Sequence, residues 1–152
     1  MTSRTVRMER LLDASPARVY RAWSDPDALT SWFPSEVEGS LAPGGRTSLV
    51  WPEQTIWWEV TQAEPDRHFR FRWSWLAGDS LRTEVTVSLS PRGFGSRLLL
   101  TDGPFDIDQP DQLDAWAECV EGWSEALANL RATLDFSVDL RHVRGRMGAG
   151  PR

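Results

Sequence analysis

The stretch PDQLDAWAECVEGWSEALANLRATLDF, residues Pro110–Phe136, decides the fold. Apolar residues recur in it at steps of three and four, whereas most of its charged residues fall elsewhere, so it predicts one long amphipathic helix. Its apolar stripe consists of Trp116, Cys119, Trp123, Leu127, Leu130 and Leu134. The leucine half is typical of a helix that closes a core, and the half with two indoles and a thiol could line a space.

Most of the chain before this helix reads as β-strands separated by turns. Val6, Met8 and Leu12 mark a first strand, and from Glu36 to Leu100 short apolar runs alternate with turns rich in proline and glycine. We count six to seven strands in a mainly antiparallel meander. A sheet followed by one long amphipathic helix predicts an α+β fold in which the helix covers the sheet.

Two short helices are expected between the first strand and the rest of the sheet. Ser15 precedes Pro16, and Asp25 precedes Pro26, so each pair combines a favoured N-cap residue with a proline at the first helical position. Pro34 ends the second helix, because the residue before a proline disfavours helical geometry.

The strands at residues 69–75 and 81–89 show the clearest alternation of apolar and polar side chains. A hairpin that buries both apolar sets places Arg72 beside Glu84 on the outer face. The same rule pairs the apolar residues of the second strand with those of the strand that follows. These pairs are expected to match Val87 with Leu98 and Val85 with Leu100. One face of the sheet is therefore expected to be apolar and rich in aromatic rings.

Length and composition predict a single domain over residues 1–140 of the 152, since 40% hydrophobic and 26% charged residues are ordinary for a globular protein. The formal net charge is −5 although the last twelve residues hold four arginines, so we expect an acidic body and a disordered basic tail, residues 141–152. An acidic body argues against a nucleic-acid-binding surface. One cysteine, no apolar run long enough for a membrane span and no signal peptide predict a cytoplasmic protein.

Two motifs carry a resemblance to a known family. The first is ASPARVYRAWSDP at residues 14–26, followed by Trp32 and Phe33, and the second is a Gly-Trp pair with regularly spaced leucines from Gly122 to Leu130. Together they resemble the START-like, or SRPBCC, superfamily. Within it, the sequence is most similar to the family of the activator of the ninety-kilodalton heat-shock chaperone ATPase.

This resemblance implies a helix-grip fold, in which a curved antiparallel sheet wraps around the C-terminal helix and leaves a cavity between them. Members of the superfamily bind lipids, polyketides and other apolar molecules, some catalyse cyclisation or dehydration, and others contact chaperones. Many relatives carry a histidine before the last helix, whereas this chain has none between Thr101 and Phe105. The resemblance therefore does not extend to chemistry based on that histidine.

No catalytic residue, metal site or cofactor is predicted from the sequence. His68 falls on the polar side of its strand and His142 in the tail, so neither lies beside a nucleophile. Cys119 lies in the apolar stripe, where a thiol is usually an inert small hydrophobe, and one cysteine with two distant histidines cannot form a zinc site. Other ionisable candidates remain, and the sequence does not show that any of them points inward. They are Glu36, Glu38, Glu59, Arg72, Glu84 and Asp102.

The aromatic residues are the main support for a ligand-binding function. Nine tryptophans exceed what a plain core of leucine, isoleucine and valine uses, and indole rings suit a pocket for a planar apolar ligand with a few polar groups. The predicted ligand-binding residues come from the sheet, the last helix and the end of the second short helix. They are Trp32, Phe33, Trp58, Phe69, Phe71, Trp73, Trp75, Trp116, Cys119 and Trp123.

The leading hypothesis is that the protein binds an apolar or aromatic small molecule, lipid-like or polyketide-like, between the sheet and the C-terminal helix. Three alternatives stay open. The rings can fill the core and leave no cavity. The protein can be a polyketide cyclase or dehydratase, which requires an inward-facing acid or base. It can also be an interaction module that contacts a chaperone or another partner through the outer sheet face, at Arg70, Arg72, Arg82 and Glu84.

Overall fold

A seven-stranded antiparallel sheet forms the body of the protein in the computed structural model, which describes residues 1–74 and 80–141. The strand order is β1-β7-β6-β5-β4-β3-β2, so every strand after β1 pairs with its neighbour in sequence and β1 joins the far edge beside β7. The elements in chain order are β1 (Ser3–Leu12), α1 (Pro16–Ser24), α2 (Pro26–Thr30), β2 (Glu36–Gly39), β3 (Arg46–Val50), β4 (Thr55–Glu64), β5 (His68–Trp73), β6 (Thr83–Arg92), β7 (Gly95–Asp106) and α3 (Pro110–Phe136).

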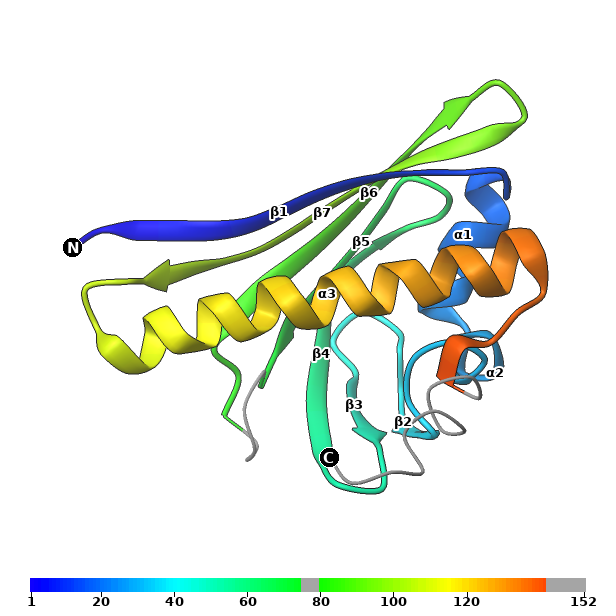
Figure 1. Ribbon diagram of the computed structural model, residues 1–152. Helices are drawn as coiled ribbons and strands as arrows, with labels where there is room; N and C mark the ends of the chain where they lie inside the picture. Colours follow the sequence, from blue (N-terminus) through cyan, green and yellow to red (C-terminus); the bar gives the residue numbers. More distant parts are fainter. Residues whose placement is uncertain (75–79, 142–152) are drawn as a thin grey trace, which may run out of the picture.

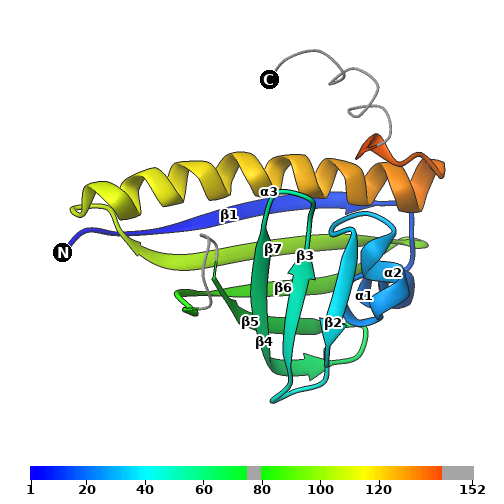
Figure 2. The ribbon, with the colours of Figure 1, turned by 90° about the horizontal axis from the view of Figure 1, so that it is seen from below.

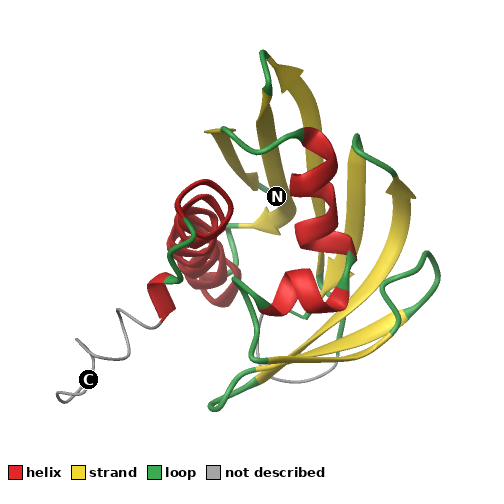
Figure 3. Cartoon of the chain, turned by 90° about the vertical axis from the view of Figure 1, so that its right-hand side faces the viewer, coloured by secondary structure: helices red, strands yellow, loops and turns green. Residues whose placement is uncertain are grey.

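The sheet curves, and the three helices lie on its concave side. Helix α3 runs across that side from end to end, whereas α1 and α2 lie beside its C-terminal half (Figures 1 and 2). Figure 3 shows the curvature most clearly, because it looks nearly along the axis of α3 and the strands bend around the helices. The α+β helix-grip fold is therefore confirmed, with two short helices after the first strand.

Both short helices begin with the caps that the sequence predicts. The Ser15 hydroxyl accepts a hydrogen bond from the Arg18 backbone N–H at 3.3 Å, and the Asp25 carboxylate accepts one from the Ala28 N–H at 3.0 Å. Each bond pairs one of the N–H groups that a helix leaves free at its start. Helix α3 ends where Ser137 takes a left-handed conformation with φ of 55°.

The β5–β6 pairing has the predicted register, with Arg72 opposite Glu84. The ion pair of Glu84 is formed with Arg70 instead, at 3.6 Å. A diagonal neighbour on the same face is within reach of a long side chain, which accounts for the change of partner.

The β6–β7 register differs from the prediction by two residues and changes what the interior contains. Val87 lies opposite Leu100, and Val85 lies opposite Asp102. Strand β7 therefore extends past Leu100, its predicted end, and the Asp102 side chain points to the same inner face as Leu98 and Leu100. Gly103 allows β1 to approach closely, since a Cβ atom there would lie 2.9 Å from the Thr5 hydroxyl oxygen. Because of the β6–β7 register, β7 places the Asp102 carboxylate in the core.

Helix α3 presents most of its predicted stripe to the core. Cys119, Trp123, Leu127 and Leu130 are buried, whereas Trp116 and Leu134 are only partly covered. Alanines at the neighbouring helical positions 115 and 126 are buried beside them. Within residues 1–74 and 80–141, no helix combines the length and the apolar character that crossing a membrane would need.

Arg141, the last described residue, makes contacts with the rest of the chain. Arg141, which the sequence assigns to the basic tail, forms an ion pair with Asp139 at 2.8 Å and bonds to the backbone after α2. The rest of the predicted tail, residues 142–152, lies outside the described residues.

Candidate functional site

The site begins with a continuous set of aromatic rings between the sheet and α3. Trp58 of β4 stacks on Phe71 of β5 with ring centroids 3.8 Å apart, and Trp73 of β5 contacts Trp123 of α3 at 5.0 Å. Phe69 contacts Trp58 at 6.3 Å. The alternation of β5 explains this arrangement, because residues two apart on a strand share a face.

The residues after α2 join the same set of rings. Trp32 and Phe33 stack on each other at 5.0 Å, and Phe33 stacks on Trp123 at 5.6 Å with an interplanar angle of 23°. Phe33 also meets Trp51 edge-on at 5.0 Å. The predicted residues from the sheet, from α3 and from the α2–β2 connection are thus brought together.

Trp23 of α1 lies at the centre of this interior, although it is not among the predicted site residues. Its ring is fully buried and contacts the rings of Trp32 at 4.9 Å, Trp123 at 5.9 Å, Trp58 at 6.3 Å and Phe71 at 6.4 Å. The helical spacing places Trp23 on the inner face of α1, but only the docking of α1 onto the sheet makes it a shared neighbour.

Three predicted residues have other surroundings. Trp116 is half-buried, and its ring lies 5.6 Å from the guanidinium carbon of Arg4 in a cation–π contact. Cys119 is buried beside Asp102. Trp75 lies outside the described residues.

The rings named above contact one another as in a filled core. Their centroid separations fall in the range of favourable aromatic pairs, which is roughly 4.5–7 Å, or slightly below it.

Two hollows lie at the surface of the protein and not among these rings. One of about 530 Å³ lies between the helices and the β2–β3 turn, lined by Tyr20, Ser24 and residues 39–43 among others. Another of about 290 Å³ is lined by Thr30, Ser35, Asp139 and Arg141.

Asp102 is the polar centre of the interior. Its exposed fraction is 0%, and its carboxylate accepts hydrogen bonds from the Trp123 indole at 3.0 Å, the Thr83 hydroxyl at 2.6 Å and the Trp73 indole at 3.2 Å. Strands β5, β6 and β7 and helix α3 each supply one member of this group. A single carboxylate therefore connects the sheet to the middle of α3.

Burial governs the protonation of this group. Burial raises the pKa of the Asp102 carboxyl, and the hydrogen bonds from Thr83, Trp123 and Trp73 offset part of that rise. Burial also raises the pKa of the neighbouring Cys119 thiol, and the Asp102 charge adds to the rise. Cys119 therefore stays a thiol at neutral pH, which agrees with its predicted inert character.

Other indoles in the interior keep a free donor. The buried Nε1–H groups of Trp23, Trp58 and Trp116 make no hydrogen bond within the described residues. An indole nitrogen can only donate, so the interior presents more donors than its acceptors use. No cluster of three or more metal-ligating side chains exists among residues 1–74 and 80–141.

Sequence reasoning left Asp102 as an unplaced carboxylate, although a signal for it was present. Leu98, Leu100 and Asp102 alternate along β7, so whichever face takes the two leucines also takes the aspartate. The predicted strand ends at Leu100, two residues before Asp102, although the alternation continues to Asp102.

Comparison with known proteins identifies the family. Residues 13–135 match the family described as Activator of Hsp90 ATPase homolog 1-like protein. The chain belongs to this family. The resemblance drawn from the two sequence motifs is therefore confirmed. No curated protein sequence matches the chain significantly.

Solved structures share the fold of this chain. The solution structure of the Aha1 dimer from Colwellia psychrerythraea has a TM-score of 0.77 at 18% identity, covering 88% of this chain and 97% of that chain. Protein MLL2253 from Mesorhizobium loti has a TM-score of 0.75 at 27% identity, covering 86% and 96%. DynU16, a protein in the dynemicin biosynthetic locus, has a TM-score of 0.74 at 21% identity, covering 88% and 48%.

Proposed function

We propose that this member of the Activator of Hsp90 ATPase homolog 1-like family binds an apolar, aromatic small molecule between the sheet and α3. Because the rings contact one another, the ligand takes the place of some ring–ring contacts around Trp123 instead of filling an existing void. Asp102 and the free indole N–H groups provide its polar contacts. The ligand class that fits is a planar molecule with carbonyl or hydroxyl oxygens.

The observation that carries this proposal is the buried Asp102 network within an aromatic interior. A core built only for stability gains little from a carboxylate at 0% exposure, because removing its charge from water is unfavourable. Three further buried indole donors have no acceptor among residues 1–74 and 80–141. Polar groups of this kind in an apolar interior are typical of small-molecule sites, where they orient the ligand.

A fluorescence titration with matched tryptophan variants tests the proposal. A panel of planar polycyclic ketones and phenols is titrated into the wild-type protein while tryptophan emission is recorded. We expect saturable quenching that is retained in Trp57→Phe, since Trp57 lies on the outer face with Arg46 at 5.0 Å over its ring. Trp123→Phe loses one indole donor and ring area, and we expect about tenfold weaker binding, or about 1.4 kcal/mol. No saturable change with any member of the panel would contradict the proposal.

A second candidate, a dehydratase, is favoured by one specific observation. The enzyme hypothesis requires an inward-facing acid, and Asp102 points inward with its pKa raised by burial. In such a reaction the Asp102 carboxyl donates a proton to a substrate hydroxyl that leaves as water. The resulting carboxylate removes a proton from the adjacent carbon, which forms the double bond and restores the acid.

Asp102→Asn separates this candidate from simple binding. The amide keeps the shape and one acceptor oxygen, so quenching by the best ligand of the panel should remain within a few-fold of wild type. If the protein is a dehydratase, conversion of a β-hydroxy ketone of the same ring system, followed by mass spectrometry, disappears in this variant. Binding without conversion in the wild-type protein excludes the enzyme.

A further inference from the structure

The connection between α2 and β2 forms the outer wall of the aromatic interior near the end of α3. Phe33 on this connection stacks on Trp123 at 5.6 Å and is itself only partly buried. Trp32 beside it is fully buried and contacts Trp23. On this side of the aromatic interior, the Phe33 ring alone thus covers the Trp123 ring.

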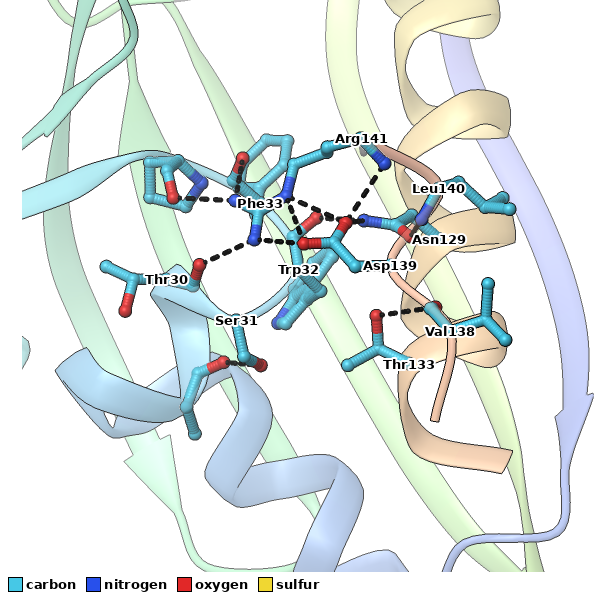
Figure 4. Close-up of polar contacts among 12 residues, drawn as sticks. Thr30, Ser31, Trp32, Phe33, Asn129, Thr133, Val138, Asp139, Leu140 and Arg141 are labelled. Carbon is cyan, nitrogen blue, oxygen red and sulfur yellow. Dashed lines mark hydrogen bonds and ion pairs between the residues drawn. The ribbon is translucent and has the colours of Figure 1, made fainter. Parts of the chain in front are cut away.

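Arg141 holds the backbone of this connection through its carbonyl groups. Its guanidinium donates to the carbonyl of Thr30 at 2.9 Å, of Pro34 at 2.9 Å and of Phe33 at 3.3 Å (Figure 4). Asn129 of α3 adds a fourth contact, from its amide to the Trp32 carbonyl at 2.7 Å. Four of the five carbonyls from residue 30 to residue 34 are therefore bonded to Arg141 or Asn129, and the Phe33 carbonyl also accepts the Trp51 indole N–H at 3.1 Å.

Arg141 is in turn oriented by residues at the end of α3. The Asp139 carboxylate accepts hydrogen bonds from the Arg141 Nη2 at 2.8 Å and Nε at 3.0 Å. The Asn129 amide donates to Asp139 at 3.1 Å, and its oxygen accepts the Leu140 N–H at 2.7 Å (Figure 4). We call Asn129, Asp139 and Arg141 the C-terminal latch.

The surroundings leave room for the connection to move. Helix α2 packs on α1 and β2 but makes no backbone approach to α3 within the described chain. The hollow of about 290 Å³ is lined by Thr30, Ser35 and two latch residues, and Pro26 at the start of α2 borders the hollow of about 530 Å³. The contacts between Arg141 and Asp139 are partly exposed, with 34% of the Arg141 side chain and 21% of the Asp139 side chain accessible, whereas the bond from Asn129 to the Trp32 carbonyl is buried. Water can replace partly exposed contacts far more readily than it can replace those of a buried network.

We infer that Arg141 is a positioning residue that keeps residues 30–34 closed over the aromatic interior. We also infer that the ligand enters the interior where this connection moves away. The inference rests on the proposed function, and it adds the route and the residue that controls it. When the latch opens, Phe33 leaves the Trp123 ring and gives an apolar ligand a face on which to stack. Opening requires the loss of the latch contacts and of the Trp51–Phe33 hydrogen bond, and no separation of α3 from the sheet.

Hydrogen exchange with three variants tests the latch directly. Arg141→Ala removes all its side-chain contacts, and Arg141→Lys keeps the charge but not the forked donors that reach several carbonyls. The control is Arg131→Ala, because Arg131 bonds to the Leu11 carbonyl at 2.8 Å and ties α3 to β1 instead. We expect exchange at residues 30–36 to rise about tenfold in Arg141→Ala, less in Arg141→Lys, and not in Arg131→Ala. Unchanged exchange in Arg141→Ala, or an equal rise in Arg131→Ala, would overturn the latch.

Stopped-flow binding of 1-anilinonaphthalene-8-sulfonate then tests the route. We expect its association rate to rise about tenfold in Arg141→Ala while its dissociation rate stays nearly unchanged, so that the dissociation constant falls about tenfold, because only the closed, ligand-free state loses the latch contacts. A change in the dissociation constant with unchanged rates of association would overturn the route. If the dye binds no variant while exchange still rises, the proposed function and the route fail and the latch stands.

Discussion

Two aspartates tie the two halves of α3 to the rest of the molecule, and their surroundings are opposite. Asp102 is fully buried, its partners are neutral donors on Trp73, Thr83 and Trp123, and burial raises its pKa. Asp139 is partly exposed beside Arg141, whose hydrogen bonds lower its pKa to about 2.

This difference indicates which contact can open. Contacts of Asp102 are closed off from water, so breaking one leaves an unpaired donor in an apolar interior. Contacts of Asp139 and Arg141 can be exchanged for contacts with water at little free-energy cost. The middle of α3 is therefore fixed to the sheet, whereas the segment beside its C-terminal end can move.

The largest expected effect is the loss of stability in Asp102→Ala. The change leaves the Trp123 indole N–H without its acceptor, leaves Trp73 only the Thr83 hydroxyl at 3.1 Å, and creates a small void, so we expect the free energy of unfolding to fall by about 3 kcal/mol. Urea unfolding followed by circular dichroism measures it. Asp102→Asn keeps one acceptor oxygen and should lose about 1 kcal/mol. Equal losses in both variants would mean that the hydrogen bonds contribute little.

The next effect is the dependence of stability on pH. Because the folded protein raises the pKa of Asp102 above its unfolded value of 3.8, the folded state binds the proton more tightly. Stability should then fall as pH rises from about 4 through the raised pKa, with a slope of up to about 1.4 kcal/mol per pH unit. Asp139 acts in the opposite direction, since its contribution is present above pH 3.8 and is lost as pH falls toward 2.

Urea unfolding of the wild type and of Asp102→Asn at a series of pH values from 4 to 8 isolates this slope. We expect the wild type to lose stability relative to the variant over that series. Asp139→Asn, as the matched control, should keep the wild-type slope in this window. A constant difference between the wild type and Asp102→Asn would show that Asp102 is ionised throughout.

The amino-acid sequence predicts the elements that local patterns determine. The long helix, the two capped short helices and the β5–β6 register follow from periodicity, from Ser15 and Asp25, and from alternation, all of which involve neighbours in sequence. Asp102 could also have been placed from alternation along β7. Its three partners could not, because they come from strands and a helix whose docking no local pattern determines.

The latch is harder still to predict from sequence. Arg141 and Asn129 bond to backbone carbonyls at residues 30–34, and every residue carries a carbonyl, so the pairing leaves no pattern in the sequence. A terminal run of arginines and glycines is typical of a disordered tail. Only the contacts show that Arg141 belongs to the domain.

The smallest expected effect concerns Asp139→Asn, which keeps an oxygen for Asn129 but removes the charge opposite Arg141. We expect the free energy of unfolding to change by no more than about 0.5 kcal/mol, because the pair is partly exposed. Exchange at residues 30–36 should nevertheless rise, since Arg141 loses the group that orients it.

Asp135→Asn provides the matched control for this last variant. Asp135 also lies at the end of α3, but it accepts hydrogen bonds from the Asp13 and Ala14 N–H groups at 2.9 and 3.0 Å and does not bond to the α2–β2 connection. Hydrogen exchange with mass spectrometry should show faster exchange near residue 13 in Asp135→Asn and near residue 33 in Asp139→Asn. If Asp139→Asn lowers global stability as much as Asp102→Ala does, the end of α3 is as firmly fixed as its middle, and the contrast between the two aspartates fails.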